Sequence, residues 1–369
     1  MIDRSIRLHM TTKPVAKKKT RSHLHFAVFV MNDLGDEPST VSTRIPVTII
    51  TGFLGSGKTT LISRLVKECS GKKIAVIQNE VSEEMGIESA IVTDSDGNII
   101  PDFYELPNGC VCCSAKDDMI LALENIINLG RQRIDAVVVE TTGVADPCSV
   151  AELFWLDGEL GSSLELDGVV AVVDSLNFQD IIADDHSLNH SEIGRRQVAV
   201  ADRILINKTD LVSDTSTIRK LIQSLNPSAE IIETSRSNVS ADWVLNIGSF
   251  SAKRAVDLLD HSSHVLSTVD HVFMKFPADT VFDAKSLERS LGEILWGERP
   301  EHGEVYRIKG LFRSSPTDWN MIQAVGALFE TTPTIPTDRS SDSKFLFIGS
   351  NLNKELLKQT ISLAILGTS

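Results

Sequence analysis

Short apolar runs alternate with amphipathic stretches of helix length from Ile45 onward, and this alternation predicts an α/β fold. IPVTIIT at 45–51 predicts a strand, and KTTLISRLVKECS at 58–70 predicts the helix after it. Several later runs are apolar throughout, as strands of a parallel sheet covered on both faces require. The further predicted elements are strands at 72–78, 134–140, 166–174 and 202–208 and a helix at 117–130. The pattern predicts a mostly parallel sheet flanked by helices.

A polar stretch at 248–265 indicates a linker, and a different pattern begins after it. This second pattern predicts a small α+β domain. Its expected elements are a segment at 267–276, a helix at 283–296, strands at 305–312, 319–329 and 344–350, and a helix at 353–366. We interpret Trp296, Arg307 and Lys309 as core-packing and sheet-edge residues rather than as contacts to another protein. A chain of 369 residues suits two domains, which we place at 45–258 and 259–369.

Composition narrows the class of protein. The formal net charge is −14, which argues against a surface made mainly for nucleic acid, although a local anion site is compatible with it. No eighteen apolar residues follow one another, as a membrane-spanning helix would need. Five cysteines, an odd number, are typical of unpaired thiols in a reducing compartment. We therefore expect a cytoplasmic protein whose partners include neither nucleic acid nor a membrane.

Residues 1–44 differ in composition from the rest of the chain. Between Met1 and Met31 stand seven Lys and Arg residues and a single acid, Asp3. We expect a disordered N-terminal extension here. PVAKKKTR at 14–21 also has the composition of a nuclear localisation signal. The shortage of acidic residues is shared with organellar transit peptides.

The segment GFLGSGKTT at 52–60 has the pattern G-x-x-x-x-G-K-[ST] between a predicted strand and a predicted helix. Glycines let the backbone wrap so that its N–H groups and the helix dipole face a phosphate chain. Lys58 would bridge the β- and γ-phosphates, and Thr59 would ligate Mg²⁺. The expected nucleotide-binding residues are Gly52, Gly55, Ser56, Gly57, Lys58, Thr59 and Thr60.

The tetrapeptide NKTD at 207–210 stands at the end of a predicted strand and predicts recognition of guanine. The Asp210 carboxylate would accept from both N1–H and the exocyclic amine of guanine, a pair of donors that adenine lacks. Asn207 would serve the other side of the base, and the stem of Lys208 would cover its face. The alternative is that Asp210 only starts the next helix. We expect a second base-side loop at ETSRS, residues 233–237.

The segment VVVETTG, which ends at Gly143, supplies candidates for hydrolysis. Glu140 ends an otherwise apolar strand and would orient Mg²⁺ or the attacking water. Gly143 would offer its backbone N–H to the γ-phosphate. Loss of the γ-phosphate releases such loops in GTPases, which turns hydrolysis into movement. The expected catalytic residues are Lys58, Thr59 and Glu140, and the alternative for Glu140 is a solvated strand end.

Three cysteines, Cys110, Cys112 and Cys113, precede a predicted helix whose start carries the capping box Ser114-x-x-Asp117. A helix N-terminus favours thiolates, and thiolates bind soft metals. Disulfides within such short spans would be strained. Three thiolates can bind Zn²⁺ and leave one position for water, another side chain or a ligand from a partner. A redox switch and buried structural thiols are the alternatives.

These motifs resemble, in order and spacing, those of the CobW-like metallochaperone GTPases. ETTGVADP, FWLDGELGS, VVDS, ILINKTDLV and YRIKGLF look most like the eukaryotic branch of zinc-regulated GTPase metalloprotein activators. The resemblance covers residues 45 to about 365. It implies GTP-driven transfer of zinc to a client metalloprotein, with the C-x-C-C motif holding the metal and moving with the nucleotide state.

The chain departs from the family pattern after its second predicted strand, where the family has N-E-F-G. Glu80 matches the family's glutamate and remains a candidate switch or metal carboxylate, but Val81 and Ser82 come after it. Asn177 stands where some relatives carry a histidine. His186 and His190 have helical spacing, yet we interpret ADDHSLNHSE at 183–192 as a solvated loop.

The N-terminal part departs as well. Vertebrate members of the zinc branch engage type I methionine aminopeptidase through a Cys-Pro-Glu-Leu-Val-Pro segment, and no cysteine precedes Cys69 here. The resemblance therefore implies a client metalloprotein, with that aminopeptidase as the family's example, but without the docking motif.

The sequence as a whole predicts a GTPase that hydrolyses GTP to GDP with Mg²⁺ and delivers Zn²⁺ to another protein. A nucleotide-gated zinc store or sensor without directed transfer is the alternative. A P-loop kinase is disfavoured, because N-K-T-D would have no purpose in one. Thiolates also bind Cu(I), so the physiological metal stays open at this stage.

Overall fold

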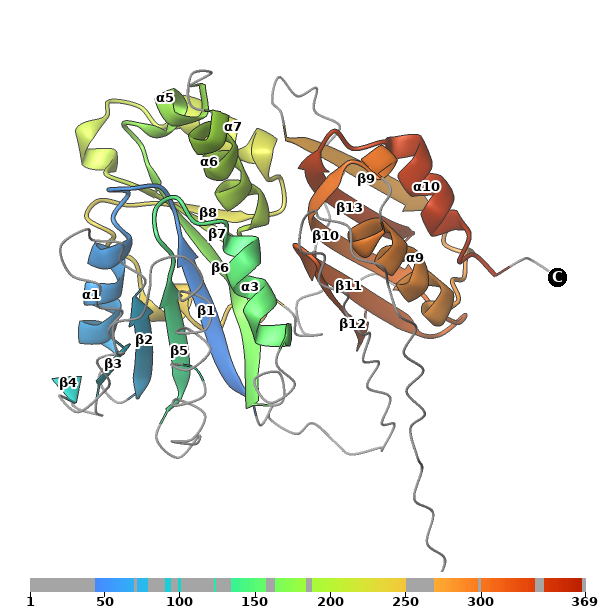
Figure 1. The fold of residues 1–369 in the computed structure, drawn as a ribbon, viewed down its shortest axis with the longest axis horizontal. Helices are drawn as coiled ribbons and strands as arrows, with labels where there is room; N and C mark the ends of the chain where they lie inside the picture. Colours follow the sequence, from blue (N-terminus) through green and yellow to red (C-terminus); the bar gives the residue numbers. More distant parts are fainter. Residues whose placement is uncertain are drawn as a thin grey trace, which may run out of the picture. The chain divides into compact units, whose positions relative to one another are not determined.

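An eight-stranded sheet and a five-stranded sheet organise the part of the chain that the computed structural model describes (Figure 1). Residues 42–369 form one compact unit. The described residues are 44–69, 72–78, 90–93, 99–100, 123, 134–156, 163–183, 188–249, 269–297, 300–335 and 342–366. The expected extension at 1–44 lies outside them except for Arg44, and so does the predicted helix at 117–130 except for Leu123.

The larger sheet has the strand order β4-β3-β2-β5-β1-β6-β7-β8. All neighbours from β2 to β8 run parallel, whereas β3 and β4 are antiparallel additions at one edge. The predicted, mostly parallel sheet is confirmed. The strands are β1 Ile45–Thr51, β2 Ile74–Gln78, β3 Ala90–Thr93, β4 Ile99–Ile100, β5 Ala136–Glu140, β6 Leu164–Asp174, β7 Arg203–Asn207 and β8 Glu230–Glu233.

Helices cover both faces of this sheet (Figure 1). Ile50 on β1 packs in one apolar cluster with α1 and α8, while its neighbour Ile49 packs in another with α3, α6 and α7. Because side chains alternate along a strand, burying both faces requires apolar residues at nearly every position. The helices are α1 Lys58–Glu68, α3 Pro147–Leu156, α5 Phe178–Ala183, α6 Leu188–Val200, α7 Ser216–Leu225 and α8 Ala241–Val244, with a 3₁₀ turn η1 at Thr209–Leu211.

The smaller sheet is antiparallel, in the order β12-β11-β10-β13-β9. One of its faces packs on α9 and α10 through a cluster that includes Phe282, Phe312 and Phe345. The elements are β9 Asp270–Phe276, α9 Ala284–Trp296, η2 Pro300–His302, β10 Glu304–Arg313, β11 Trp319–Val325, β12 Leu328–Thr334, β13 Ser343–Ser350 and α10 Lys354–Ser362. This arrangement confirms the predicted α+β module.

One predicted strand of this module is wrong. The run at 319–329 forms two strands, β11 and the start of β12, joined by a tight turn at Gly326 and Ala327. Gly326 has φ 58°, a conformation that glycine adopts without steric cost, and this permits the two-residue turn. The single glycine within an apolar run was the signal for the hairpin.

Two basic residues of β10 are buried rather than at a solvated sheet edge. Arg307 is 1% exposed and donates to the backbone oxygen of Val200 and to the carboxylate of Asp202. The Lys309 Nζ lies 3.7 Å from the same carboxylate. Burial would raise the pKa of Asp202, but Arg307 and Lys309 hold it below its usual value. β10 is therefore joined by charge to the start of β7 on the larger sheet.

Apolar packing joins the two sheets as well. Tyr306 of β10 and Ile348 of β13 belong to the same core cluster as Val198 and Val200 of α6. The described helices include none that is both long and apolar enough to cross a membrane.

Candidate functional site

The phosphate loop joins β1 to α1 at the carboxyl edge of the larger sheet. Three glycines in it have positive φ: 138° at Gly52, 70° at Gly55 and 110° at Gly57. A Cβ on Gly52 would lie 2.2 Å from the backbone oxygen of Val172, and one on Gly57 would lie 2.3 Å from the side-chain nitrogen of Asn207. Both positions therefore exclude any larger residue. The backbone conformation and the close neighbours explain this glycine spacing.

Lys58 begins α1 and turns back over the loop. Its Nζ donates to the backbone oxygens of Gly52 at 2.8 Å and Phe53 at 3.2 Å. The residue is only 7% exposed, and burial lowers the pKa of its ammonium, which the Glu140 carboxylate partly opposes. The ammonium is thus held at the concave side of the loop, where the sequence expects phosphate oxygens.

The side chains of Thr59, at the start of α1, and Glu140, at the end of β5, are in contact. The Thr59 Oγ1 donates to the Glu140 Oε1 at 2.9 Å, and Glu140, at the end of β5, is 4% exposed. Adjacent ligands of an octahedral Mg²⁺ with bonds of about 2.1 Å are themselves about 3.0 Å apart. Two oxygen donors at this spacing beside a phosphate loop fit that ion.

The loop after β5, residues 141–146, lies against the phosphate loop. Thr141 donates through its backbone N–H to Ile50 and through its hydroxyl to Thr51, both at 3.0 Å. A Cβ on Gly143 would lie 2.5 Å from the backbone nitrogen of Leu54, so only glycine permits this approach. The structure brings the predicted γ-phosphate sensor next to the predicted phosphate loop.

Asn207 connects the phosphate loop with the loop after β8. Its amide nitrogen donates to the backbone oxygen of Ser56 at 2.9 Å and to the Ser237 hydroxyl at 3.0 Å. Its amide oxygen accepts from the Ser237 N–H at 2.8 Å, and Ser237 donates to the backbone oxygen of Gly57. The sequence assigned Asn207 to the base, and did not predict this bracing of the loop.

Asp210 lies in the 3₁₀ turn η1, shortly after β7, and faces the same loop after β8. Ser235 donates its hydroxyl to the Asp210 carboxylate at 2.7 Å, and this bond lowers the pKa of Asp210. Because Asp210 is exposed and ionised, its carboxylate can accept from a ligand. Ser235 and Ser237 lie within the predicted second base-side loop, although their individual roles could not be read from the sequence.

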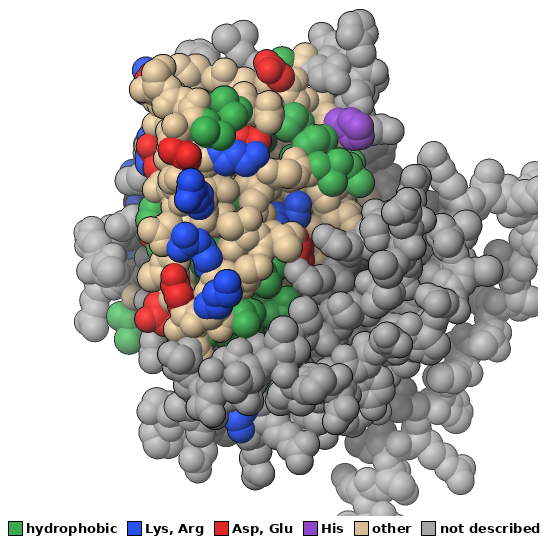
Figure 2. Space-filling view, turned by 90° about the vertical axis from the view of Figure 1, so that its left-hand side faces the viewer, with side chains coloured by type: hydrophobic (Ala, Val, Ile, Leu, Met, Phe, Trp, Pro, Cys, Tyr) green, Lys and Arg blue, Asp and Glu red, His purple; other side chains and the backbone are tan. Residues whose placement is uncertain are grey.

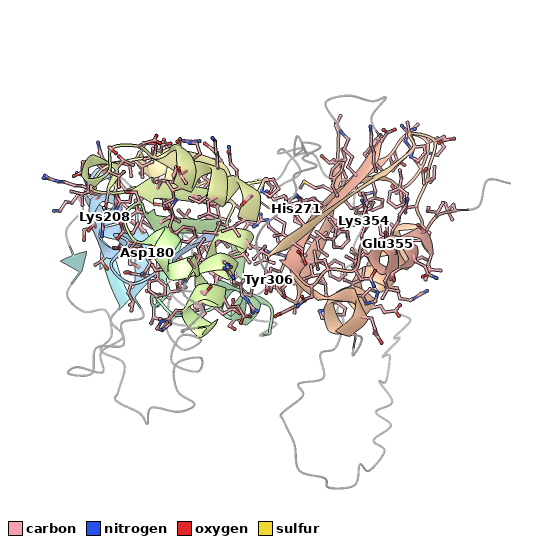
Figure 3. The ribbon with its side chains drawn as sticks, turned by 90° about the horizontal axis from the view of Figure 1, so that it is seen from above. Asp180, Lys208, His271, Tyr306, Lys354 and Glu355 are labelled. Carbon is pink, nitrogen blue, oxygen red and sulfur yellow. The ribbon has the colours of Figure 1, made fainter. Side chains whose placement is uncertain are left out.

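Lys208, labelled in Figure 3, has φ 63° and an ion pair with Asp174. The Lys208 Nζ lies 2.8 Å from the Asp174 Oδ2, which also accepts from the Asn177 amide at 2.8 Å. The ion pair at Nζ therefore fixes the position of the aliphatic part of the Lys208 side chain. We did not predict a role for Asp174 from the sequence, because nothing near it in the chain indicates its ion pair with Lys208.

A group of basic side chains lies on the face that includes α1 (Figure 2). Arg236, in the loop after β8, is exposed, and Arg64 of α1 donates to Asn238 of the same loop at 2.9 Å. These two residues place positive charge at that loop in an otherwise acidic chain, and such charge attracts anions.

The predicted zinc site lies outside the described residues, since Cys110, Cys112, Cys113 and Glu80 all fall there. The described residues contain no group of three or more His, Cys, Asp or Glu side chains that could hold a metal. His186 is also outside them, but His190 belongs to α6, so the predicted loop at 183–192 is wrong from Leu188 onward. The exposed His190 ring packs against the Phe53 ring in an edge-to-face arrangement, with the ring centroids 5.5 Å apart.

Two family models match the chain. The model described as CobW/HypB/UreG, nucleotide-binding domain matches residues 46–233. The model described as cobalamin synthesis protein cobW C-terminal domain matches residues 272–364.

Similar proteins cover nearly the whole chain. Zinc-regulated GTPase metalloprotein activator 1 of Schizosaccharomyces pombe is 33% identical over 87% of this chain and 86% of its own length. Zinc chaperone YjiA of Escherichia coli is 29% identical over 85% of this chain and 96% of its own length. The crystal structure of the Zn(II)-bound YjiA GTPase from E. coli has a TM-score of 0.65 at 25% identity, and the match covers 88% of this chain and 99% of that one.

Proposed function

We propose that this chain, which belongs to the CobW/HypB/UreG nucleotide-binding family, couples GTP hydrolysis to the transfer of zinc to a client metalloprotein. The chain is a GTPase of this family, with a mostly parallel sheet and a separate antiparallel C-terminal sheet. We also propose the domain limits 45–258 and 259–369.

Guanine selectivity and hydrolysis would use the residues assembled at the carboxyl edge of the sheet. The Asp210 carboxylate would accept from the guanine N–H groups, and the backbone N–H groups of residues 52–60 would bind the phosphates. Lys58 would stabilise charge on the β- and γ-phosphate oxygens as the bond to the γ-phosphate breaks. Glu140 would orient the attacking water, and the Gly143 N–H would contact the γ-phosphate.

Thr59 and Glu140 would hold Mg²⁺, Thr59 directly and Glu140 directly or through water. Bound there, the ion would neutralise charge on the β- and γ-phosphate oxygens. The oxygen spacing of 2.9 Å between the two side chains supports this assignment.

One observation carries the link between nucleotide and zinc. β2 pairs with β5 so that Gln78 lies opposite Glu140, and the chain leaves β2 at Gln78. The segment from there to β5 contains Glu80 and the three cysteines. The metal motif is therefore part of a segment that starts beside the hydrolytic carboxylate. Rearrangement around Glu140 on hydrolysis would act on the start of that segment.

A pair of zinc titrations tests the coupling, one with a non-hydrolysable GTP analogue and one with GDP. We expect zinc affinity to differ between them by about 5- to 100-fold, which is the usual range of couplings between two sites. Cys112→Ser should lose most of the zinc affinity, because a hydroxyl is a poor zinc ligand. Cys69→Ala removes a cysteine outside the motif and should behave like wild type. Equal zinc affinities in both nucleotide states would contradict the proposal.

The second candidate is a zinc store or sensor in which nucleotide binding alone sets zinc affinity. A zinc-accepting chelator separates the two functions. Transfer predicts that zinc passes to the chelator when GTP is hydrolysed but not with the analogue, whereas a store predicts equal release with both. Identification of the client needs the protein loaded with GTP and zinc as bait for metalloproteins.

A further inference from the structure

Gln197 on α6 holds the loop that contains Gly143. Its side-chain nitrogen donates to the backbone oxygens of Gly143 and Ala145, each at 3.2 Å. The residue is 2% exposed. An amide NH₂ has two hydrogens, so both are used on this one loop. Removing them would leave carbonyl groups of the 141–146 loop without these donors in a buried position.

Arg196, the preceding residue, holds the end of the same loop. Its Nη1 lies 2.7 Å from the Asp146 Oδ2, while the Asp146 Oδ1 accepts from the Cys148 N–H at the start of α3. The Arg196 side chain is only 17% exposed. Burial would lower the pKa of Arg196, but Asp146 and then Glu304 raise it above its ordinary value, so the charge is secure.

Arg196 also reaches β10 of the smaller sheet. Its Nη2 lies 2.8 Å from the Glu304 Oε1, and its guanidinium lies over the ring of Tyr306, 4.4 Å from the centroid. Tyr306 is labelled in Figure 3. The same Nη2 lies 3.1 Å from Glu192, one turn earlier on α6. One guanidinium therefore touches both the 141–146 loop and β10.

We infer that Gln197 and Arg196 are positioning residues for GTP hydrolysis, and that Arg196 makes the rate depend on how Glu304 of β10 is placed. The inference rests on the proposed role of Gly143 as the γ-phosphate contact. Gln197 fixes the carbonyl groups of the residues on both sides of Val144, and Arg196 fixes Asp146, where the loop enters α3. A protein that binds the C-terminal sheet and draws Glu304 away from Arg196 would thereby change the position of the 141–146 loop.

The role of Gln197 is tested with Gln197→Met, which keeps the length of the side chain and removes its donors. We expect kcat for GTP to fall about tenfold, since a loop set wrongly for the transition state loses catalysis rather than ground-state binding. The dissociation constant for GDP, which lacks the γ-phosphate, should stay within about twofold. An unchanged kcat, or equal losses in kcat and GDP affinity, would overturn this part.

The role of β10 is tested with Glu304→Gln against Glu192→Gln. Both remove one carboxylate from the same Arg196 nitrogen, and the two glutamates are 56% and 58% exposed, so both variants should fold. We expect Glu304→Gln to change kcat about two- to fivefold, the scale of a partly exposed ion pair, and Glu192→Gln to change it less than 1.5-fold or so. Equal effects of the two would overturn the coupling to β10.

A double variant shows whether Glu304 acts through Arg196. In an Arg196→Met background, Glu304→Gln should have no further effect on kcat, because the shared contact is already gone. Additive effects would place Glu304 on another route and would also overturn the coupling.

All of these measurements are made with a zinc-selective chelator and an excess of Mg²⁺. A failure of zinc transfer therefore cannot affect them. Gly143→Ala separates the inference from the proposed function. If Gly143→Ala leaves kcat unchanged, the proposed role of Gly143 fails. If it lowers kcat and the affinity for a non-hydrolysable GTP analogue but leaves the affinity for GDP unchanged, while Gln197→Met and Glu304→Gln leave kcat unchanged, the role of Gly143 stands and the inference alone fails.

Discussion

At the scale of single residues, two side chains of the candidate site, Lys58 and Asn207, hold the backbone of the phosphate loop in place. Lys58 spans the carbonyl groups of its own loop, and Asn207 ties Ser56 to Ser237. Such bonds hold the phosphate loop in one shape, and a preformed loop lowers the ordering cost of nucleotide binding. Asp210 differs from these two, because it is exposed and its carboxylate accepts from the Ser235 hydroxyl rather than holding backbone.

We predict that Asp210→Asn weakens GTP binding by about 2 to 4 kcal/mol, the scale of losing charge-assisted hydrogen bonds to a base. The folded protein should be nearly as stable as wild type, since the side chain is exposed. Calorimetric titration with GTP and ATP measures the effect. Asp214→Asn, an exposed aspartate shortly after the 3₁₀ turn, is the control and should bind GTP normally. Equal wild-type affinity for the two nucleotides would contradict the guanine assignment.

At the scale of elements, the strands were predictable because burial on both faces leaves a continuous apolar run, as in β5 and β7. The hairpin at Gly326 was missed, because both of its strands share one apolar run and a single glycine, with φ 58°, is the only sign of the turn within that run. The contacts of Gln197 were also beyond the sequence. Its partners are 52 and 54 positions away, and the period of a helix says nothing about which loop lies opposite a buried amide.

The edge strand β12 carries an unfavourable charge. Burial raises the pKa of Glu330 above its ordinary 4.5, Arg44 opposes this, and Glu165 adds to it. Between pH 4.5 and the raised value the folded state binds more protons than the unfolded state, so this residue makes stability fall as pH rises. Above the raised pKa of Glu330, the full free-energy cost of burying its ionised carboxylate remains.

We therefore predict that Glu330→Gln stabilises the protein at pH 7 by about 1 kcal/mol, the usual size of a single substitution, and that the gain vanishes below its ordinary pKa. Denaturant unfolding at several pH values measures this. Glu301→Gln, an exposed glutamate, should change nothing by comparison. A Glu330→Gln variant that is less stable than wild type at pH 7 would show that the carboxylate is needed as an acceptor.

At the scale of the whole molecule, a buried charge cluster and a shared apolar core join the two sheets. Arg307 and Lys309 hold the Asp202 carboxylate, which also accepts from the Val169 N–H at 3.0 Å. Because the folded pKa of Asp202 is lowered, its contribution is present above its unfolded pKa and is lost as pH falls through the folded value. Acid should therefore weaken the connection between the sheets.

We predict that Arg307→Met destabilises the protein by about 3 to 5 kcal/mol, because it strips a buried carboxylate of its main partner. Lys275→Met, which removes an exposed ion pair from the same sheet, should cost less than about 1 kcal/mol. Calorimetry together with tryptophan fluorescence checks both, since Trp243 reports on the larger sheet and Trp319 on the smaller. The wild type should unfold in one transition, and two separate transitions would contradict a shared core.

The shared core also decides where this chain can be cut. A fragment that ends before residue 269 would expose the apolar surface that Tyr306 and Ile348 cover and would leave Asp202 without its two cations. Such a fragment is expected to aggregate rather than to survive as a smaller GTPase. For protein engineering, the two sheets therefore form one unit, and neither is expected to serve as a module without the other.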